Sequence, residues 1–469
     1  LVILMLGHLV IVAARYQAGW IEGLALSWVL GAGITSVLML WLSGVGIGLN
    51  GQVVILSVFA AFTTIAALWG RRKVVTQPTS EGKQHKSTGR PPSTPERLLQ
   101  WSLCALLILE ISVVAVMAVG RPLQVWDSWV NWGVKARIIF LEGGISPAVY
   151  SDPSRAVTQL DYPLLVPLNE AWLYRWVGTP DDRLAGVVSL LFYLSLIGIF
   201  YSTLRRTGIR HTGALAATVA IATVANIAGL AGIVFSELPL VVLALIASLY
   251  LLAWLKHGEP RTLAIAAICA GLMPWTKREG LVLLGALCLA LVLTNARSRR
   301  AWRAIGAFAI SAGLLSAPWY LFMAQQGIVN AAFLPVTPGV FAANIDRWGT
   351  ILQLVWNSLT SYTSGYIWPL TTIGMLVLYL VMRRVPGGAR RTVTSFLPVA
   401  AVLYVLMTGF MYFFSAFVPY EQHILASVDR LIMQVTPYLL VWAVVRAHET
   451  GLAGLTMRTA SELDANASL

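Results

Sequence analysis

The chain has 469 residues, of which 58% are hydrophobic and 11% are charged, and its mean hydropathy is +0.75. A soluble domain carries about 25% charged residues, so the composition excludes an ordinary soluble protein and indicates an integral membrane bundle. The net charge of +13 could point to nucleic acid. The basic residues, however, stand in short runs between apolar segments, as in the cytoplasmic loops of membrane proteins. We therefore predict an all-α, polytopic membrane protein with no nucleic-acid partner.

Apolar stretches recur along the whole chain. A helix needs about 20 apolar residues to cross the hydrocarbon of a bilayer. About thirteen stretches are candidates: 1–15, 23–48, 51–70, 100–120, 184–204, 212–235, 238–255, 262–276, 279–295, 304–324, 367–382, 393–414 and 429–446. The first is interpreted as a membrane helix rather than a signal segment, because apolar spans continue throughout. The aromatic and polar stretch 348–367 is expected at the membrane interface or dipping into it.

The basic loops between the stretches predict one orientation. Segment 71–99 mixes Lys and Arg with Ser, Thr, Gly and Pro and is predicted to be a disordered cytoplasmic loop. Counting spans from it places the other basic runs on the same side: 205–210, 256–261, 297–303 and 383–391. The chain then divides into extra N-terminal helices at 1–70, the loop, a main membrane module at 100–446 and a cytoplasmic tail at 447–469.

The same count places five segments on the outer side: 121–183, 235–238, 276–280, 325–366 and 414–428. These segments and the helix ends beside them hold most of the residues that are costly near a membrane: Asp127, Lys135, Asp161, Glu237, Lys277, Arg278, Glu279, Glu421, His423, Asp429 and Arg430. A charged side chain at the centre of a membrane helix costs about 2.5–3.5 kcal/mol. The clustering of these costly residues on one side points to a functional site near the non-cytoplasmic surface.

The first outer loop, 121–183, carries aromatic residues around a carboxylate. Trp126, Trp129 and Trp132 are three residues apart, which predicts one common face on a helix, and Asp127 stands among them. One interpretation is an interfacial aromatic belt with basic side chains reaching past it. The other is a groove with aromatic walls, a carboxylate at its mouth and Lys135 as a cation for a phosphate or sugar.

Two further acidic residues have both a structural and a functional interpretation. Asp161 lies with Tyr162 just before Pro163, where it could cap the helix that follows or belong to the site. Glu237 lies in a tight turn between spans and could be a polar turn residue or contribute to the site.

Positive charge recurs on the outer side, against the usual bias. Lys277 and Arg278 could bind an anionic ligand or simply pair with Glu279 or another carboxylate. His423 could be an interfacial polar residue, and Asp429 with Arg430 could form a self-satisfied helix cap. Together with Lys277 and Arg278, Arg430 could instead complete a clamp for a phosphate.

Short motifs in a fixed order resemble the integral-membrane glycosyltransferases of the GT-C superfamily, notably bacterial relatives of dolichyl-phosphate-mannose–protein mannosyltransferases. The motifs are Trp-Asp-Ser-Trp with a following Trp and Lys-Ala at 126–136, Asp-Tyr-Pro-Leu-Leu at 161–165, Glu-Leu-Pro at 237–239, Thr-Lys-Arg-Glu-Gly at 276–280, Ala-Pro-Trp-Tyr at 317–320 and Ser-Val-Asp-Arg-Leu at 427–431. The resemblance covers about 100–446 and implies a GT-C-like bundle with a large first outer loop containing interfacial helices, for which 133–141 is suited.

The resemblance also implies a mechanism. A polyprenyl-phosphate sugar would be bound in a cavity open to the outer leaflet, with Asp127 as the general base and Asp161 as a second catalytic carboxylate. Lys277, Arg278, Arg430 and Lys135 would bind the donor phosphate. Trp126, Trp129, Tyr162, Glu237 and His423 would contact the substrate. The expected location is the inner (plasma) membrane, with the active site on the extracytoplasmic side and membrane lipids as surroundings.

The sequence departs from the family pattern in the first loop. Many relatives have adjacent acidic residues there, whereas Ser128 follows Asp127 here. We therefore predict no metal ion and no other cofactor, although a divalent metal is possible for the superfamily. A non-catalytic scaffold subunit with this fold and a transporter of lipid-linked substrates remain alternatives. The sugar and the acceptor are not identified by the sequence.

Overall fold

The computed structural model describes residues 1–73, 93–150, 152–364, 366–382 and 393–449. These residues form helices and connecting loops, with no β-strand among them and one isolated antiparallel bridge between Phe333 and Ser415. The prediction of an all-α protein is confirmed. The basic run 383–391 lies outside the described residues, as do positions 74–92 of the predicted cytoplasmic loop and 450–469 of the predicted tail.

Every predicted membrane stretch is helical. In chain order the helices of these stretches are α1 (Val2–Ala13), α2 (Trp20–Gly44), α3 (Leu49–Lys73), α4 (Thr94–Val119), α8 (Asp182–Arg206), the pair α9 (His211–Ala222) and α10 (Ala225–Ala231), α11 (Glu237–His257), α12 (Pro260–Thr276), α13 (Glu279–Asn295), the pair α14 (Arg299–Leu315) and α15 (Ala317–Gln325), α18 (Ile367–Met382), α19 (Phe396–Met411) and α20 (Tyr420–Glu449). The connections between α4 and α8 and between α15 and α18 hold the other α-helices: α5 (Val134–Leu141), α6 (Pro147–Tyr150), α7 (Leu165–Val177), α16 (Pro338–Ala343) and α17 (Trp348–Leu359).

Not all of these helices are long enough to cross a bilayer. Seven helices in the described residues have the length and composition of a span, or nine if each bent pair counts as one. The bends are 68° between α9 and α10 and 45° between α14 and α15. Others are shorter than the about 20 residues required, such as α1 with 12 residues and α13 with 17. The chain is a multi-pass membrane protein, but the predicted number of about thirteen spans is not confirmed.

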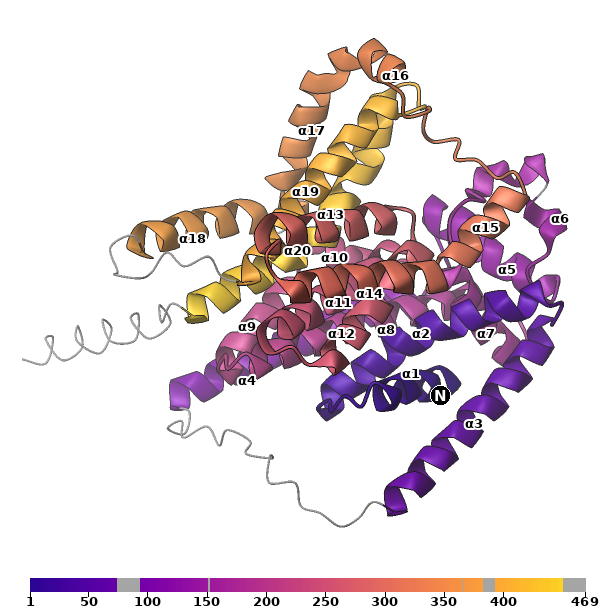
Figure 1. Cartoon of the computed structure of the whole chain (residues 1–469), viewed down its shortest axis with the longest axis horizontal. Coiled ribbons are helices and arrows are strands. Elements are labelled where there is room, and N and C mark those ends of the chain that lie inside the picture. Colours follow the sequence, from indigo (N-terminus) through magenta and orange to yellow (C-terminus); the bar gives the residue numbers. More distant parts are fainter. Residues whose placement is uncertain (74–92, 151, 365, 383–392, 450–469) are drawn as a thin grey trace, which may run out of the picture.

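The helix α11 is the centre of the bundle, whereas α3 and α4 lie at its edge (Figure 1). In the most apolar window of α11, 94% of the residues are buried, against 22% in α3 and 11% in α4. The exposed side chains of α3 and α4 include Phe62, Ile108 and Val116. An apolar surface of this extent is unfavourable in water, so these two helices face lipid hydrocarbon.

The first two helices pack so closely that glycine is needed at their contact. A Cβ atom at Gly31 of α2 would lie 1.9 Å from the backbone oxygen of Ile3 in α1. Small residues allow this close approach in membrane bundles. The helix α2 also bonds to the rest of the bundle, because the Trp275 indole donates to the Ser36 hydroxyl at 2.8 Å and the Asn169 amide donates to the carbonyl of Ala32 at 3.1 Å. The N-terminal helices therefore pack against the main module.

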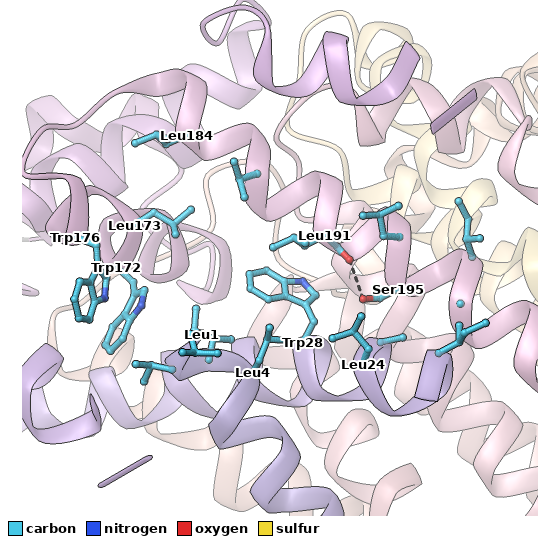
Figure 2. A pocket seen from close by; sticks show the side chains of 18 of the residues that line it. Leu1, Leu4, Leu24, Trp28, Trp172, Leu173, Trp176, Leu184, Leu191 and Ser195 are labelled. Atoms are coloured by element: carbon cyan, nitrogen blue, oxygen red, sulfur yellow. Dashed lines mark hydrogen bonds between the residues drawn. The ribbon is translucent and has the colours of Figure 1, made fainter. Parts of the chain in front are cut away.

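A large cavity lies between α1, α2, α7 and α8 (Figure 2). Its volume is about 940 Å³, and its walls include Leu4, Leu24, Trp28, Trp172 and Trp176. The hydroxyl of Ser195, the one polar side chain group in the wall besides the indole N–H groups, donates to the carbonyl of Leu191. No titratable side chain lines this cavity. Its lining suits hydrocarbon, and the candidate site for chemistry lies elsewhere.

Candidate active site

The connection between α4 and α8 begins with a wide helical turn that separates the three tryptophans. A π-helical segment, Ser128–Gly133, follows Asp127 and runs directly into α5. Trp126 and Trp129 are exposed and their rings meet edge to face at 6.2 Å, whereas Trp132 is buried and stacks on Tyr162 at 5.3 Å. The prediction of one common face for all three is wrong, because the turn is wider than that of an α-helix.

The buried Lys135 fastens a neighbouring segment of the same loop. Its ammonium donates to the backbone oxygens of Gln159 at 2.6 Å and Tyr162 at 3.4 Å, and lies near the rings of Trp132 and Tyr162. Burial lowers the pKa of Lys135 to about 7, although the nearby Asp161 carboxylate opposes this shift. The contacts of Lys135 hold the segment that carries Asp161 and Tyr162 in place.

The carboxylate of Asp161 is buried and paired with Arg278. Trp319 donates from its indole nitrogen to the backbone oxygen of Asp161 at 3.3 Å. The helix α7 begins after Leu164 and has no side-chain cap. The interpretation of Asp161 as the cap of that helix is therefore wrong, and its side chain serves the ion pair.

A tight connection between α12 and α13 presents the cations. Lys277 has extended backbone, with φ −157° and ψ 156°, between the two helices. A Cβ atom at Gly280 would lie 2.1 Å from the backbone oxygen of Met273, so glycine allows α13 to return against the end of α12. The Thr-Lys-Arg-Glu-Gly motif thus combines the cations with the residue that the reversal requires.

Glu237 joins the cations of two distant segments. Its Oε1 atom lies 2.9 Å from Lys277 Nζ and 3.1 Å from Arg430 Nη1. Lys277 Nζ also lies 2.8 Å from Glu279 Oε1, and Arg430 Nη1 lies 2.8 Å from Asp127 Oδ2. These contacts form a continuous chain from Asp127 through Arg430, Glu237 and Lys277 to Glu279.

Most of these groups line one cavity of about 410 Å³. Of the predicted site residues, it is lined by Asp127, Tyr162, Lys277, Arg278, His423 and Arg430. The carboxylate of Glu237 and the side chains of Asp161 and Lys135 are buried behind the lining. The exposed Trp126 and Trp129 are not part of the wall, and their role in substrate contact stays a prediction.

His423 is held in a defined orientation within the wall. Its Nδ1 atom lies 2.8 Å from the Ser415 hydroxyl, and its ring stacks on Phe417 at 4.4 Å. Asp429, next to Arg430 in the chain, instead accepts from the hydroxyls of Ser358 and Thr363. Asp429 and Arg430 therefore do not form a self-contained pair.

Other wall residues were not singled out from the sequence. Asn131 and Tyr320 lie within motifs, whereas Asn330, Phe333 and Tyr412 belong to none. Asn330 and Phe333 come from the connection between α15 and α18, and Tyr412 directly follows α19 and bonds to the Ser427 hydroxyl at 2.8 Å. In the part of the chain that the structure describes, no group of three or more His, Cys, Asp or Glu residues could hold a metal ion.

Comparisons with known proteins give a likeness of structure only. No family model and no curated protein matches the chain. Among solved structures, it is similar to ArnT from Cupriavidus metallidurans in the apo state, with a TM-score of 0.48, and to the same protein bound to undecaprenyl phosphate, with a TM-score of 0.49. Both matches have 16% sequence identity and cover 76% of this chain.

The chain spans 63% of the length of the ArnT chains that it matches. Because both TM-scores are below 0.5, the functional argument depends on the residues of the site.

Proposed function

We propose that the chain is a membrane glycosyltransferase that moves a sugar from a polyprenyl-phosphate donor to an acceptor hydroxyl at the extracytoplasmic face. The observation that best supports this function is the cavity of about 410 Å³ that is lined by the carboxylate of Asp127 and by the cations Lys277, Arg278 and Arg430. The sequence motifs that resemble GT-C enzymes contribute all four residues. A carboxylate beside cations is suited to proton removal next to a departing phosphate.

The proposed step is a displacement at the anomeric carbon of the donor sugar. The acceptor oxygen forms a bond to this carbon while the bond from the carbon to the phosphate oxygen breaks. The electron pair of the broken bond leaves with the polyprenyl phosphate, whose charge Lys277, Arg278 and Arg430 stabilise. Asp127 takes the hydroxyl proton. The second predicted catalytic carboxylate, Asp161, acts in this proposal by holding Arg278, with which it is paired.

The rest of the cavity wall is suited to the lipid part of the donor. Leu281, Val282, Phe333, Met411 and Leu431 contribute apolar surface beside the cations. Burial of a prenyl chain contributes about 0.8 kcal/mol of favourable free energy for each CH₂ group removed from water. The phosphate, in contrast, needs charged partners. The combination of both surfaces in one cavity supports a lipid-linked phosphate over a free sugar nucleotide.

One observation favours a second candidate, a non-catalytic scaffold with the same fold. Lys277, Arg278 and Arg430 each already have a carboxylate partner, as expected if these charges only stabilise the bundle. The open cavity beside them favours the enzyme, because a scaffold has no need of it. The two functions differ in whether the protein binds a prenyl phosphate.

The variant Asp127→Asn tests the proposed function. It keeps the shape of the side chain but removes the proton acceptor, so we expect sugar transfer to fall by about 10²–10⁴-fold. Transfer would be measured with the lipid donor that copurifies with the protein, identified by mass spectrometry. The matched control is Asp429→Asn, because Asp429 lies next to Arg430 in the chain and bonds to Ser358 and Thr363. Full transfer by Asp127→Asn would remove Asp127 from the role of base.

A further inference from the structure

Each of two cations in the cavity wall has two carboxylate partners of different kinds. Arg430 contacts Glu237 at 3.1 Å and Asp127 at 2.8 Å, and Lys277 contacts Glu237 at 2.9 Å and Glu279 at 2.8 Å. Glu237 is 1% exposed and does not line the cavity. Asp127 and Glu279 do line it. Both cations are therefore paired in the same way. They share Glu237 behind the cavity wall, and each has its own carboxylate partner in the wall.

The partners in the wall are the ones that an entering anion can replace. The side chains of Asp127 and Glu279 are 33% and 25% exposed, against 1% for Glu237. A partly exposed carboxylate that loses its cation regains water, whereas a carboxylate buried with no partner costs several kcal/mol. Both contacts of Glu237 use Oε1, and within the described residues its buried Oε2, like the Oε2 of Glu279, has no hydrogen-bond partner. Glu237 would thus keep both cations while the wall carboxylates release them.

The geometry points to a partner exchange: the phosphate of the lipid donor replaces Asp127 on Arg430 and Glu279 on Lys277, while Glu237 holds both cations in place. This inference rests on the proposed function and adds a coupling to it. In the free protein, Oδ2 of Asp127 is engaged by Arg430. Once the phosphate has taken Arg430, that oxygen is available to the acceptor hydroxyl. Donor binding thereby makes the base available, and Glu237 is a positioning residue for both cations.

The other contacts of Arg430 allow the exchange without moving the side chain far. Its Nε atom donates to the backbone oxygen of Ala426 at 3.0 Å, and its guanidinium carbon lies 5.1 Å from the centre of the Phe235 ring. These contacts and the one with Glu237 stay in place when Asp127 leaves. The phosphate therefore meets a guanidinium that is already oriented, which lowers the entropic cost of binding.

Affinity for a prenyl phosphate tests the exchange. The probe is farnesyl phosphate in detergent, with farnesol as the matched probe that lacks the phosphate, and affinity is measured by isothermal titration. If Asp127 competes with the phosphate for Arg430, Asp127→Asn binds farnesyl phosphate about three- to tenfold more tightly than the wild type. Glu279→Gln also binds farnesyl phosphate more tightly, because Glu279 no longer competes with the phosphate for Lys277. Farnesol binding changes in neither variant, and Asp429→Asn leaves both affinities unchanged.

Two further results separate the failure of the exchange from that of the proposed function. If the wild type binds farnesyl phosphate and Asp127→Asn binds it equally or more weakly, the exchange is overturned while the proposed donor class stands. If the wild type does not prefer farnesyl phosphate to farnesol, the proposed function and the exchange both fail. For the positioning role, Glu237→Gln weakens farnesyl phosphate binding, and Glu237→Asp restores part of it. Equal affinity of Glu237→Gln and wild type would overturn that role.

Discussion

Two lysines at the candidate site show how opposite surroundings give one residue type two uses. Burial would lower the pKa of Lys277, but the carboxylates of Glu237 and Glu279 outweigh it and raise that pKa above its usual range. Lys277 thus keeps its charge, as the proposed binding of a phosphate requires. Lys135 bonds to carbonyl oxygens, and burial lowers its pKa to about 7. A lysine that is partly neutral near pH 7 is better suited to holding the loop than to binding an anion.

The depressed pKa of Lys135 predicts a pH dependence of stability. Below pH about 7 Lys135 is protonated in both the folded and the unfolded chain, and its buried charge costs stability in full. Between about 7 and 10.5 the folded protein holds the neutral amine while the unfolded chain still binds the proton. Stability therefore rises with pH in this window.

Thermal unfolding in detergent at pH 7 to 9.5 measures the effect of Lys135. The melting temperature of the wild type minus that of Lys135→Met should increase as the pH rises, because the variant lacks the titrating group. The control Lys256→Met removes an exposed lysine and should keep a constant difference from the wild type. A constant difference for Lys135→Met as well would contradict the shifted pKa.

At the scale of elements, the sequence predicts where helices form but not how they bend or pair. Apolar length is a local property, so every predicted stretch is helical, including α2 and α11. The π-helical turn after Asp127 depends on packing, since Trp132 turns inward to stack on Tyr162. The spacing of the tryptophans could not reveal that contact, which joins residues 30 positions apart in the printed sequence.

Because α1 and α2 are in close contact, even the methyl group of alanine at position 31 is expected to destabilise the protein. In Gly31→Ala the new Cβ atom would lie 1.9 Å from the backbone oxygen of Ile3, so the helices must move apart. We expect a loss of about 1–3 kcal/mol in the free energy of unfolding, measured as a lower melting temperature. The control Gly306→Ala in α14 has no atom within 4 Å of the new Cβ and should be neutral or stabilising.

At the scale of the whole molecule, charged residues form two sets at opposite ends of the long helices. The candidate site uses the first residue of α11, the connection from α12 to α13 and the early part of α20. At the other ends of these helices, Lys256 pairs with Glu449 at 3.0 Å and Arg300 donates to the backbone oxygen of Leu255 at 2.9 Å. The sequence motifs contain the charged residues of the site. Their pairing through Glu237 could not be predicted, because it joins the ends of helices far apart in the chain.

This separation predicts that the two ends are reached from opposite sides of the membrane. Two exposed positions serve as labelling sites. Trp126, which is 62% exposed, lies at the end of the bundle that holds the candidate site, and Arg261 lies in the basic run at the opposite end. Each would be changed to Cys in a chain whose own Cys104, Cys269 and Cys288 are replaced by Ala. If the basic loops are cytoplasmic, a membrane-impermeant maleimide labels Trp126→Cys in intact spheroplasts. Arg261→Cys is then labelled only after permeabilisation.

The opposite pattern of labelling would place the cavity on the cytoplasmic side. The proposed chemistry at Asp127 would survive that result, but its extracytoplasmic location would not. Labelling of both positions in intact spheroplasts would contradict the spanning of the membrane by α11, because α11 runs from Glu237 at the site to His257 beside the basic run. One experiment thus tests the orientation and the path of the central helix, independently of whether the substrate is known.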